Sequence, residues 1–133
     1  MIFSAKSRYA VRALLYAAKK GGKVRVGEVA EKTKVPKFFL SKIFEKLAKE
    51  KILKSEKGRS GGFTLIKPLN DISLYKIKKA VEGTEDLEGC LLSSGVCTYP
   101  TQKECPLHKE WETIRANIIN YMKKSKISDI PVS

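Results

Sequence analysis

Apolar side chains recur every three or four residues in five stretches of the chain and are grouped into two shorter extended stretches. This pattern predicts helices over residues 7–20, 27–33, 36–50, 71–81 and 106–124, a short extended piece at 24–26, and strands over residues 52–56 and 63–66. Gly21 ends the first helix, Pro36 suits the first turn of the third, and Ser73 suits the N-cap of the fourth. The chain is therefore predicted to be mainly α-helical.

The second and third predicted helices are joined by a tight break at Val35 and Pro36, which is typical of a helix-turn-helix motif. Two strands on either side of the basic, Gly-rich loop 57–62 follow directly and predict a hairpin. A hairpin in this position is a wing. We therefore expect a winged helix-turn-helix with a two-stranded wing, followed by a long C-terminal helix.

The third predicted helix has two chemically different faces. Its inward face is expected to hold Phe39, Leu40, Ile43, Phe44 and Leu47, and its outward face Phe38, Ser41, Lys42, Glu45 and Lys49. Because a helix fits the DNA major groove, this outward face is the candidate reader of bases. Ser41 can hydrogen-bond a base edge, Lys42 can reach guanine or a phosphate, and Phe38 can contact a thymine methyl. The alternative is that Ser41 and Lys42 are ordinary surface residues and Phe38 belongs to the core.

Other basic residues extend this candidate DNA surface. Lys57 and Arg59 occupy the predicted wing tip, where a basic side chain without bulky neighbours suits the minor groove. The start of the first helix offers phosphate contacts through Lys6, Arg8, Tyr9 and Arg12. The loop 58–62 lacks the Gly-Lys-Ser/Thr ending of a nucleotide-binding loop and leads into a strand, so nucleotide binding is not expected.

The charge is concentrated in one part of the chain, which has a formal net charge of +13 over 133 residues. Residues 1–82 hold 21 basic and 7 acidic side chains, whereas residues 83–133 hold 6 and 7. A polyanionic partner explains this division, because a generally lysine-rich surface would not stop at one boundary. We expect a DNA-binding domain over residues 1–82, a cysteine-containing sensor loop over 83–105, and a dimerisation helix with a tail over 106–133.

Three segments together resemble the IscR/NsrR/CymR-type (Rrf) family of transcription regulators: SRYAVRAL at 7–14, VPKFFLSKI at 35–43 and GRSGGF at 58–63. The resemblance extends over almost the whole chain. It implies a dimeric winged-helix regulator, expected to be a repressor, that binds imperfect palindromes in double-stranded DNA. Many such regulators sense iron–sulfur status, nitric oxide, redox state or a metabolic partner. The alternative is a cofactor-free regulator controlled by a protein or a small molecule.

Four potential metal ligands stand close together: Cys90, Cys97, Cys105 and His108, which is the only histidine. Three thiolates and an imidazole suit an iron–sulfur cluster or zinc. The resemblance favours a cluster, more specifically [2Fe–2S], and maps the fourth ligand onto His108, although the intervals between cysteines are longer here. Zinc, a thiol redox switch, cysteines without a cofactor, and a histidine that only caps or packs the last helix remain alternatives.

The last predicted helix carries apolar residues at alternating steps of four and three. These are Leu107, Trp111, Ile114, Ile118 and Tyr121. Such a seam is typical of a coiled coil and predicts a homodimer held by Trp111, Ile114, Ile118 and Tyr121. A two-fold dimer would present its two reading helices to half-sites ~34 Å apart.

Several other classes of protein are not expected. No apolar run approaches the ~20 residues of a membrane-spanning helix and no secretion signal is evident, so we expect a cytoplasmic protein without a membrane partner. An enzyme is not expected, because one histidine without a Cys-x-x-Cys pair or an acid–base constellation offers little for catalysis. An RNA-binding module is disfavoured because no aromatic platform is predicted on a sheet.

Overall fold

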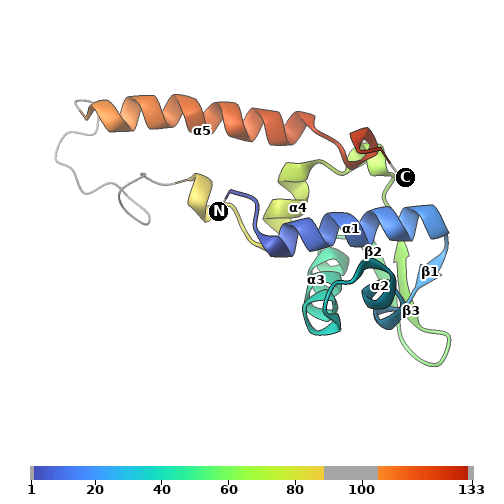
Figure 1. Cartoon of the computed structure of the whole chain (residues 1–133). Helices are drawn as coiled ribbons and strands as arrows, with labels where there is room; N and C mark the ends of the chain where they lie inside the picture. The colour runs from blue at the N-terminus through green and yellow to red at the C-terminus, as the bar shows by residue number, and fades with distance from the viewer. Residues whose placement is uncertain (1, 89–104, 132–133) are drawn as a thin grey trace.

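The computed structural model describes residues 2–88 and 105–131 (Figure 1). The helices are α1 (Ala5–Lys20), α2 (Val26–Thr33), α3 (Lys37–Lys49), α4 (Leu74–Val81) and α5 (Pro106–Lys124). The strands are β1 (Lys23–Val24), β2 (Leu53–Glu56) and β3 (Gly62–Leu65), and the short 3-10 turns are η1 (Leu69–Asp71), η2 (Glu85–Leu87) and η4 (Ile127–Asp129). The predicted order of helices with a hairpin after the helix-turn-helix is confirmed.

The first helix is the centre of the N-terminal unit, which comprises α1 to α4 and the three strands. The hydroxyl of Ser4 caps its start by accepting from the Ser7 amide at 3.4 Å, and Gly21 ends it with φ at +75°. Small buried residues such as Ala10 and Ala13 let α2, α3 and α4 pack closely around it. The N-terminal unit is therefore built on α1 rather than on the sheet.

The sheet has three antiparallel strands in the order β1-β3-β2. The expected two-stranded wing gains β1 as a third strand, with Val24 opposite Phe63. Gly62 allows this close pairing, because a Cβ there would lie 2.7 Å from the Val24 carbonyl oxygen. A strand of only two residues shows no alternation, which is why the sequence predicted an extended piece and not its partner.

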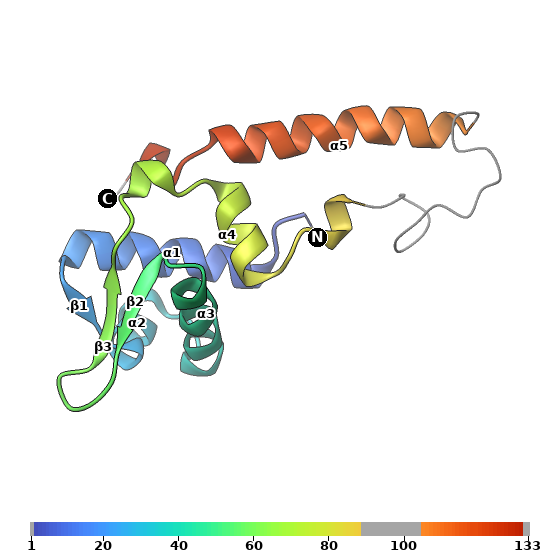
Figure 2. The same ribbon diagram turned by 180° about the vertical axis from the view of Figure 1, so that it is seen from behind.

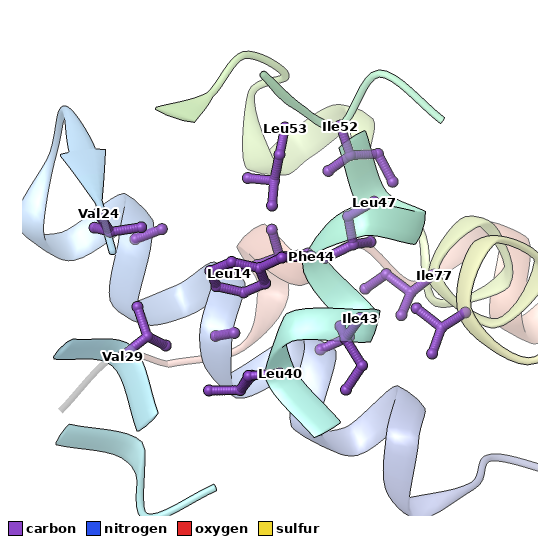
Figure 3. Packing of buried hydrophobic residues seen from close by; sticks show 14 of the residues in the cluster. Leu14, Val24, Val29, Leu40, Ile43, Phe44, Leu47, Ile52, Leu53 and Ile77 are labelled. Carbon is purple, nitrogen blue, oxygen red and sulfur yellow. The ribbon is translucent and has the colours of Figure 1, made fainter. Parts of the chain in front are cut away.

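The hydrophobic core lies between α1, α3, α4 and the base of the wing (Figure 3). Leu14, Leu40, Phe44 and Leu47 are fully buried, and the Phe44 ring meets the Phe63 ring edge-on at 5.0 Å. Phe39 differs from expectation. The sequence predicts it on the inward face of α3, but in the structure 39% of its surface is exposed. It lies at the margin of the core, where α3 meets α1.

The C-terminal helix lies apart from the helix-turn-helix. In both views α5 lies on one side of α1, while α3 and the wing project on the other (Figures 1 and 2). It packs against α4, and η4 returns the chain to the core, where Ile127 is fully buried. Ser73 caps α4 as predicted, accepting from the Lys76 amide at 3.0 Å. Within the described ranges, no helix is both long and apolar enough to cross a membrane.

Candidate nucleic-acid interface

The outward face of α3 presents the residues predicted to read bases. Phe38 is 65% exposed, which excludes the alternative that it belongs to the core, and Lys42 is also exposed. Ser41 is half-buried, and its hydroxyl donates to the Lys37 carbonyl oxygen at 3.1 Å. The three predicted readers therefore occupy one face of the first two turns of α3.

An aromatic cluster joins this face to the start of α1. The Phe38 and Phe39 rings meet edge-on at 5.7 Å, and the Phe39 ring lies 6.2 Å from that of Tyr9. Two cations flank the cluster: Arg12 lies 5.5 Å from the Tyr9 ring centroid, and the Lys42 ammonium 4.4 Å from that of Phe38. The structure thus brings predicted contacts of α1 and α3 together in one basic, aromatic surface.

The wing tip lies on the same side of the molecule as α3 (Figure 1), and its residues Lys57 and Arg59 are exposed. Two cationic side chains, one from β1 and one from the residue that follows it, hydrogen-bond to the backbone of the wing tip. The Lys23 ammonium donates to the Ser60 carbonyl oxygen and, at 2.7 Å, to the Glu56 carboxylate, while the Arg25 guanidinium donates to the Arg59 carbonyl oxygen. The hydrogen bond from Lys23 lowers the pKa of Glu56.

Sequence reasoning missed Lys23 and Arg25. A signal was available, because basic residues on either side of Val24 in an extended segment point to the same face. A groove of about 420 Å³ lies between the wing and the starts of α2 and α3, and Arg25 and Lys37 line it. The candidate interface therefore continues from α3 to the wing through this groove.

A second junction fixes α2 on α1. The Glu28 carboxylate accepts from Lys20 at 2.6 Å, from the Arg25 amide at 3.2 Å and from the Tyr16 hydroxyl at 2.9 Å. These hydrogen bonds, with that from Lys20 the largest, lower the pKa of Glu28, and the bond to Glu28 raises the pKa of Tyr16. The orientation of the helix-turn-helix is thus held by a carboxylate shared among three donors.

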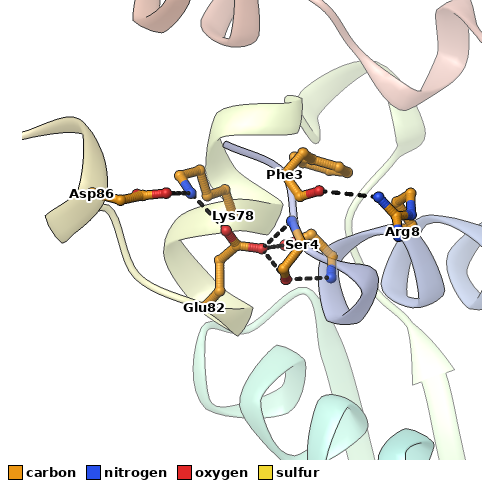
Figure 4. A network of polar contacts seen from close by, with 7 residues as sticks. Phe3, Ser4, Arg8, Lys78, Glu82 and Asp86 are labelled. Carbon is orange, nitrogen blue, oxygen red and sulfur yellow. Dashed lines mark hydrogen bonds and ion pairs between the residues drawn. The ribbon is translucent and has the colours of Figure 1, made fainter. Parts of the chain in front are cut away.

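A partly buried polar network joins the end of α4 to the start of α1 (Figure 4). The Glu82 carboxylate accepts from the hydroxyls of Ser4 and Ser7, from the Ser4 amide at 2.9 Å and from the Lys78 ammonium at 2.6 Å. Lys78 is fully buried and also lies 2.9 Å from Asp86. Burial raises the pKa of Glu82, but these donors outweigh it and lower the pKa to about 2. The next helical turn of Arg8 and Tyr9 is anchored through this network.

Two of the four predicted metal ligands can be placed. Cys105 is the N-cap of α5, and its carbonyl oxygen accepts from the His108 amide at 3.1 Å. The His108 Nε2 atom lies 3.6 Å from the Glu112 carboxylate. Cys90 and Cys97 lie outside the described residues, and the described ranges contain no group of three ligating side chains.

The predicted seam of α5 is divided between two environments. Ile114 and Tyr121 are exposed, as is Leu107, at a spacing of seven residues. Trp111 and Ile118 are half-buried. The exposed apolar stripe on α5 therefore consists of Leu107, Ile114 and Tyr121, and the Arg115 guanidinium beside it donates to the Glu88 carbonyl oxygen at 2.7 Å.

Comparison with known proteins identifies the family to which this chain belongs. A family model described as Rrf2, iron-dependent transcriptional regulator, matches residues 3–131. The chain belongs to the Rrf2 family. It is 34% identical over 131 residues to a protein of Aquifex aeolicus whose name assigns it to the HTH-type transcriptional regulators, with 98% of this chain and 91% of the relative covered. It is 30% identical to the HTH-type transcriptional regulator IscR of Cereibacter sphaeroides, over 98% of this chain and 86% of the relative.

Solved structures share the Rrf2 fold. CymR, the global cysteine regulator of B. subtilis, superposes with a TM-score of 0.73 at 21% identity, covering 97% of this chain and 95% of CymR. The IscR of T. potens gives a TM-score of 0.72 at 22% identity, covering 95% and 82%. The predicted fold class and family are confirmed, and the relatives are transcriptional regulators rather than enzymes, as predicted. This Rrf2 protein is a DNA-binding transcriptional regulator.

Proposed function

We propose that this Rrf2 protein acts as a homodimer that binds a palindromic operator and represses transcription. The observation that carries the proposal is the projection of α3 and the wing from one side of the molecule, with their exposed basic residues unobstructed by α5 (Figure 2). In this arrangement α3 enters the major groove with Phe38, Ser41 and Lys42, and the wing carries Lys57 and Arg59 to the adjacent minor groove. Arg8 and Tyr9 then face the phosphate backbone.

The stripe on α5 supports the dimer. Leu107, Ile114 and Tyr121 expose apolar surface along one line of a helix whose main packing contact within the described residues is with α4. A second copy of α5 would cover this surface, with the half-buried Trp111 and Ile118 at its edge. Residues 106–133 would then form the dimerisation unit and residues 1–82 the DNA-binding unit. Ile127 joins the two by packing into the N-terminal core.

The cofactor proposed for residues 83–105 and the start of α5 is an iron–sulfur cluster, more specifically [2Fe–2S]. Cys90, Cys97, Cys105 and His108 would hold it. The positions of Cys105 and His108, one turn apart at the N-terminus of α5, support this donor set. A bound cluster would supply a redox-sensitive centre next to the proposed dimer helix. Zinc would satisfy the same donors, and the cofactor-free regulator remains the alternative.

Binding measurements on the full chain test this function. Anaerobic reconstitution with iron and sulfide should give visible absorbance and a bound-iron content that Cys97→Ala and His108→Ala reduce. Operator affinity should then differ between the loaded and the empty protein. Colourless protein with the same operator affinity after reconstitution would favour the cofactor-free regulator, and zinc content would identify a zinc site. Absence of sequence-specific DNA binding in every state would overturn the proposal as a whole.

A further inference from the structure

The contact between Phe38 and Lys42 carries a more specific inference, which rests on the proposed insertion of α3 into the major groove. The two residues are one helical turn apart on the exposed face of α3, and the Lys42 ammonium lies 4.4 Å from the centre of the Phe38 ring. The Phe38 ring also meets the Phe39 ring edge-on, with 5.7 Å between their centroids. Phe38 therefore contacts both Lys42 and Phe39, while 65% of its surface faces solvent.

This contact gives Lys42 a defined position. A lysine side chain is flexible, and fixing it at an interface costs part of the binding free energy. The cation–π attraction restrains Lys42 over the ring before any DNA arrives. Within the described part of the chain, Lys42 forms no ion pair with a carboxylate, so its charge is available to a partner.

The two side chains offer complementary chemistry at a matching distance. An apolar ring recognises the C5-methyl group of thymine, whereas an ammonium group donates to the O6 and N7 acceptors of guanine. Successive base pairs are about 3.4 Å apart along the helix axis. A separation of 4.4 Å between the Phe38 ring centre and the Lys42 ammonium fits neighbouring base pairs better than base pairs two steps apart.

Ser41 narrows the choice of base pair further. Its hydroxyl proton is directed to the Lys37 carbonyl oxygen, so towards a further partner the hydroxyl acts as an acceptor. An acceptor at this point suits the N6 amino group of adenine, which is paired with thymine. The Phe38 contact and the Ser41 acceptor are therefore compatible with one T·A base pair.

We propose that Phe38 and Lys42 form a coupled recognition pair for a thymine whose neighbouring base pair contains guanine. Phe38 contacts the thymine methyl group and also positions Lys42 for the guanine. The specificity of the two positions is consequently linked: loss of the aromatic ring weakens the preference for guanine even where the methyl contact is kept.

Selection of operators from random duplexes with the full chain begins the test. Deoxyuridine in place of the thymine removes only the methyl group, and should cost the wild-type protein about fourfold in affinity per half-site. Phe38→Ala should be insensitive to this replacement. Lys42→Met should lose the preference for guanine over 7-deazaguanine, expected to be about tenfold. Lys79→Met, which removes the same charge from an exposed position of α4 outside the proposed interface, should keep both preferences.

Phe38→Leu distinguishes a coupled pair from two independent contacts. It should remain sensitive to deoxyuridine, because leucine still covers the methyl group, but its guanine preference should fall about two- to fivefold without the ring. An unchanged guanine preference in Phe38→Leu would overturn the coupling. A defined operator lacking adjacent thymine and guanine in its half-sites would overturn the recognition pair while leaving DNA binding intact. Failure to select any operator would overturn the DNA-binding proposal and this inference with it.

Discussion

The ammonium group of Lys78 lies 2.6 Å from the carboxylate of Glu82, and the Lys78 side chain has no exposed surface. Glu82 uses its other oxygen to accept from Ser4 and Ser7 at the start of α1. Lys78 on α4 and Glu82, the residue that caps the end of α4, thus fix the helix that carries Arg8 and Tyr9 (Figure 4). Buried charges are costly when unpaired, so this contact should dominate the response of the fold to acid.

Acid should weaken the fold through Glu82. Its pKa is about 2 in the folded protein, below the ordinary value of 4.5, so its contribution is fully present above pH 4.5 and is lost as the pH falls towards 2. This lowering of the pKa corresponds to about 3 kcal/mol of folding stability at neutral pH. Urea unfolding should show that the stability difference between wild type and Glu82→Gln shrinks by about 2 kcal/mol between pH 7 and pH 3. A difference independent of pH would contradict the ionised network.

Removal of the buried ammonium should be more damaging than removal of its exposed neighbour. Lys78→Met leaves Glu82 ionised without its main charged donor, and we expect a loss of about 3 kcal/mol in the free energy of unfolding. Lys79→Met removes the same charge from an exposed position of α4 and should change stability by no more than about 0.5 kcal/mol. Chemical denaturation of both variants measures this. Equal effects would show that the Lys78 ammonium is not structurally engaged.

The wing should lose its fixed position without Lys23 and Arg25. The double variant Lys23→Met/Arg25→Met removes the donors to the carbonyl oxygens of Ser60 and Arg59. Amide hydrogen exchange of the free protein should then accelerate at residues 58–61, and operator affinity should fall about tenfold. Lys54→Met, on the neighbouring strand β2, serves as the control. Unchanged exchange at the wing tip would contradict the positioning role.

The α5 stripe should control the oligomeric state. Ile114→Arg places a charge in the proposed dimer seam. The dissociation constant of the dimer, measured by sedimentation, should rise by at least about tenfold. Ala116→Arg lies on the opposite face of α5 and is exposed, so it should remain as dimeric as the wild type. A wild-type dimer that Ile114→Arg leaves intact would place the interface elsewhere.

The sequence predicted the helices, the helix-turn-helix and the hairpin because their apolar spacing and capping residues are local properties. It did not predict the exposure of Phe39, since periodicity identifies the face of α3 but not how far α1 covers it. It also missed the burial of Lys78. Lysine is ordinarily exposed, and the carboxylate of Asp86 that helps to neutralise it belongs to a separate turn.

The residues of the candidate site were likewise only partly predictable from the sequence. Phe38, Ser41 and Lys42 were identified because helical geometry puts them on one face, and the structure places them there. The roles of Lys23 and Arg25 depend on a pairing between β1 and β3 that brings together residues about 40 positions apart. Contacts of this kind are set by tertiary structure, and a single sequence contains only their potential partners.

The most direct measurement of the central claim is the affinity of the full chain for a selected operator and for a scrambled duplex across a range of salt concentrations. Wild-type protein should bind the operator at least a thousandfold more tightly, with affinity falling steeply as salt rises. Arg59→Ala with Lys42→Met should abolish most of this preference while leaving the melting temperature unchanged. Equal affinity for both duplexes, or a preference that survives the loss of both side chains, would contradict the account.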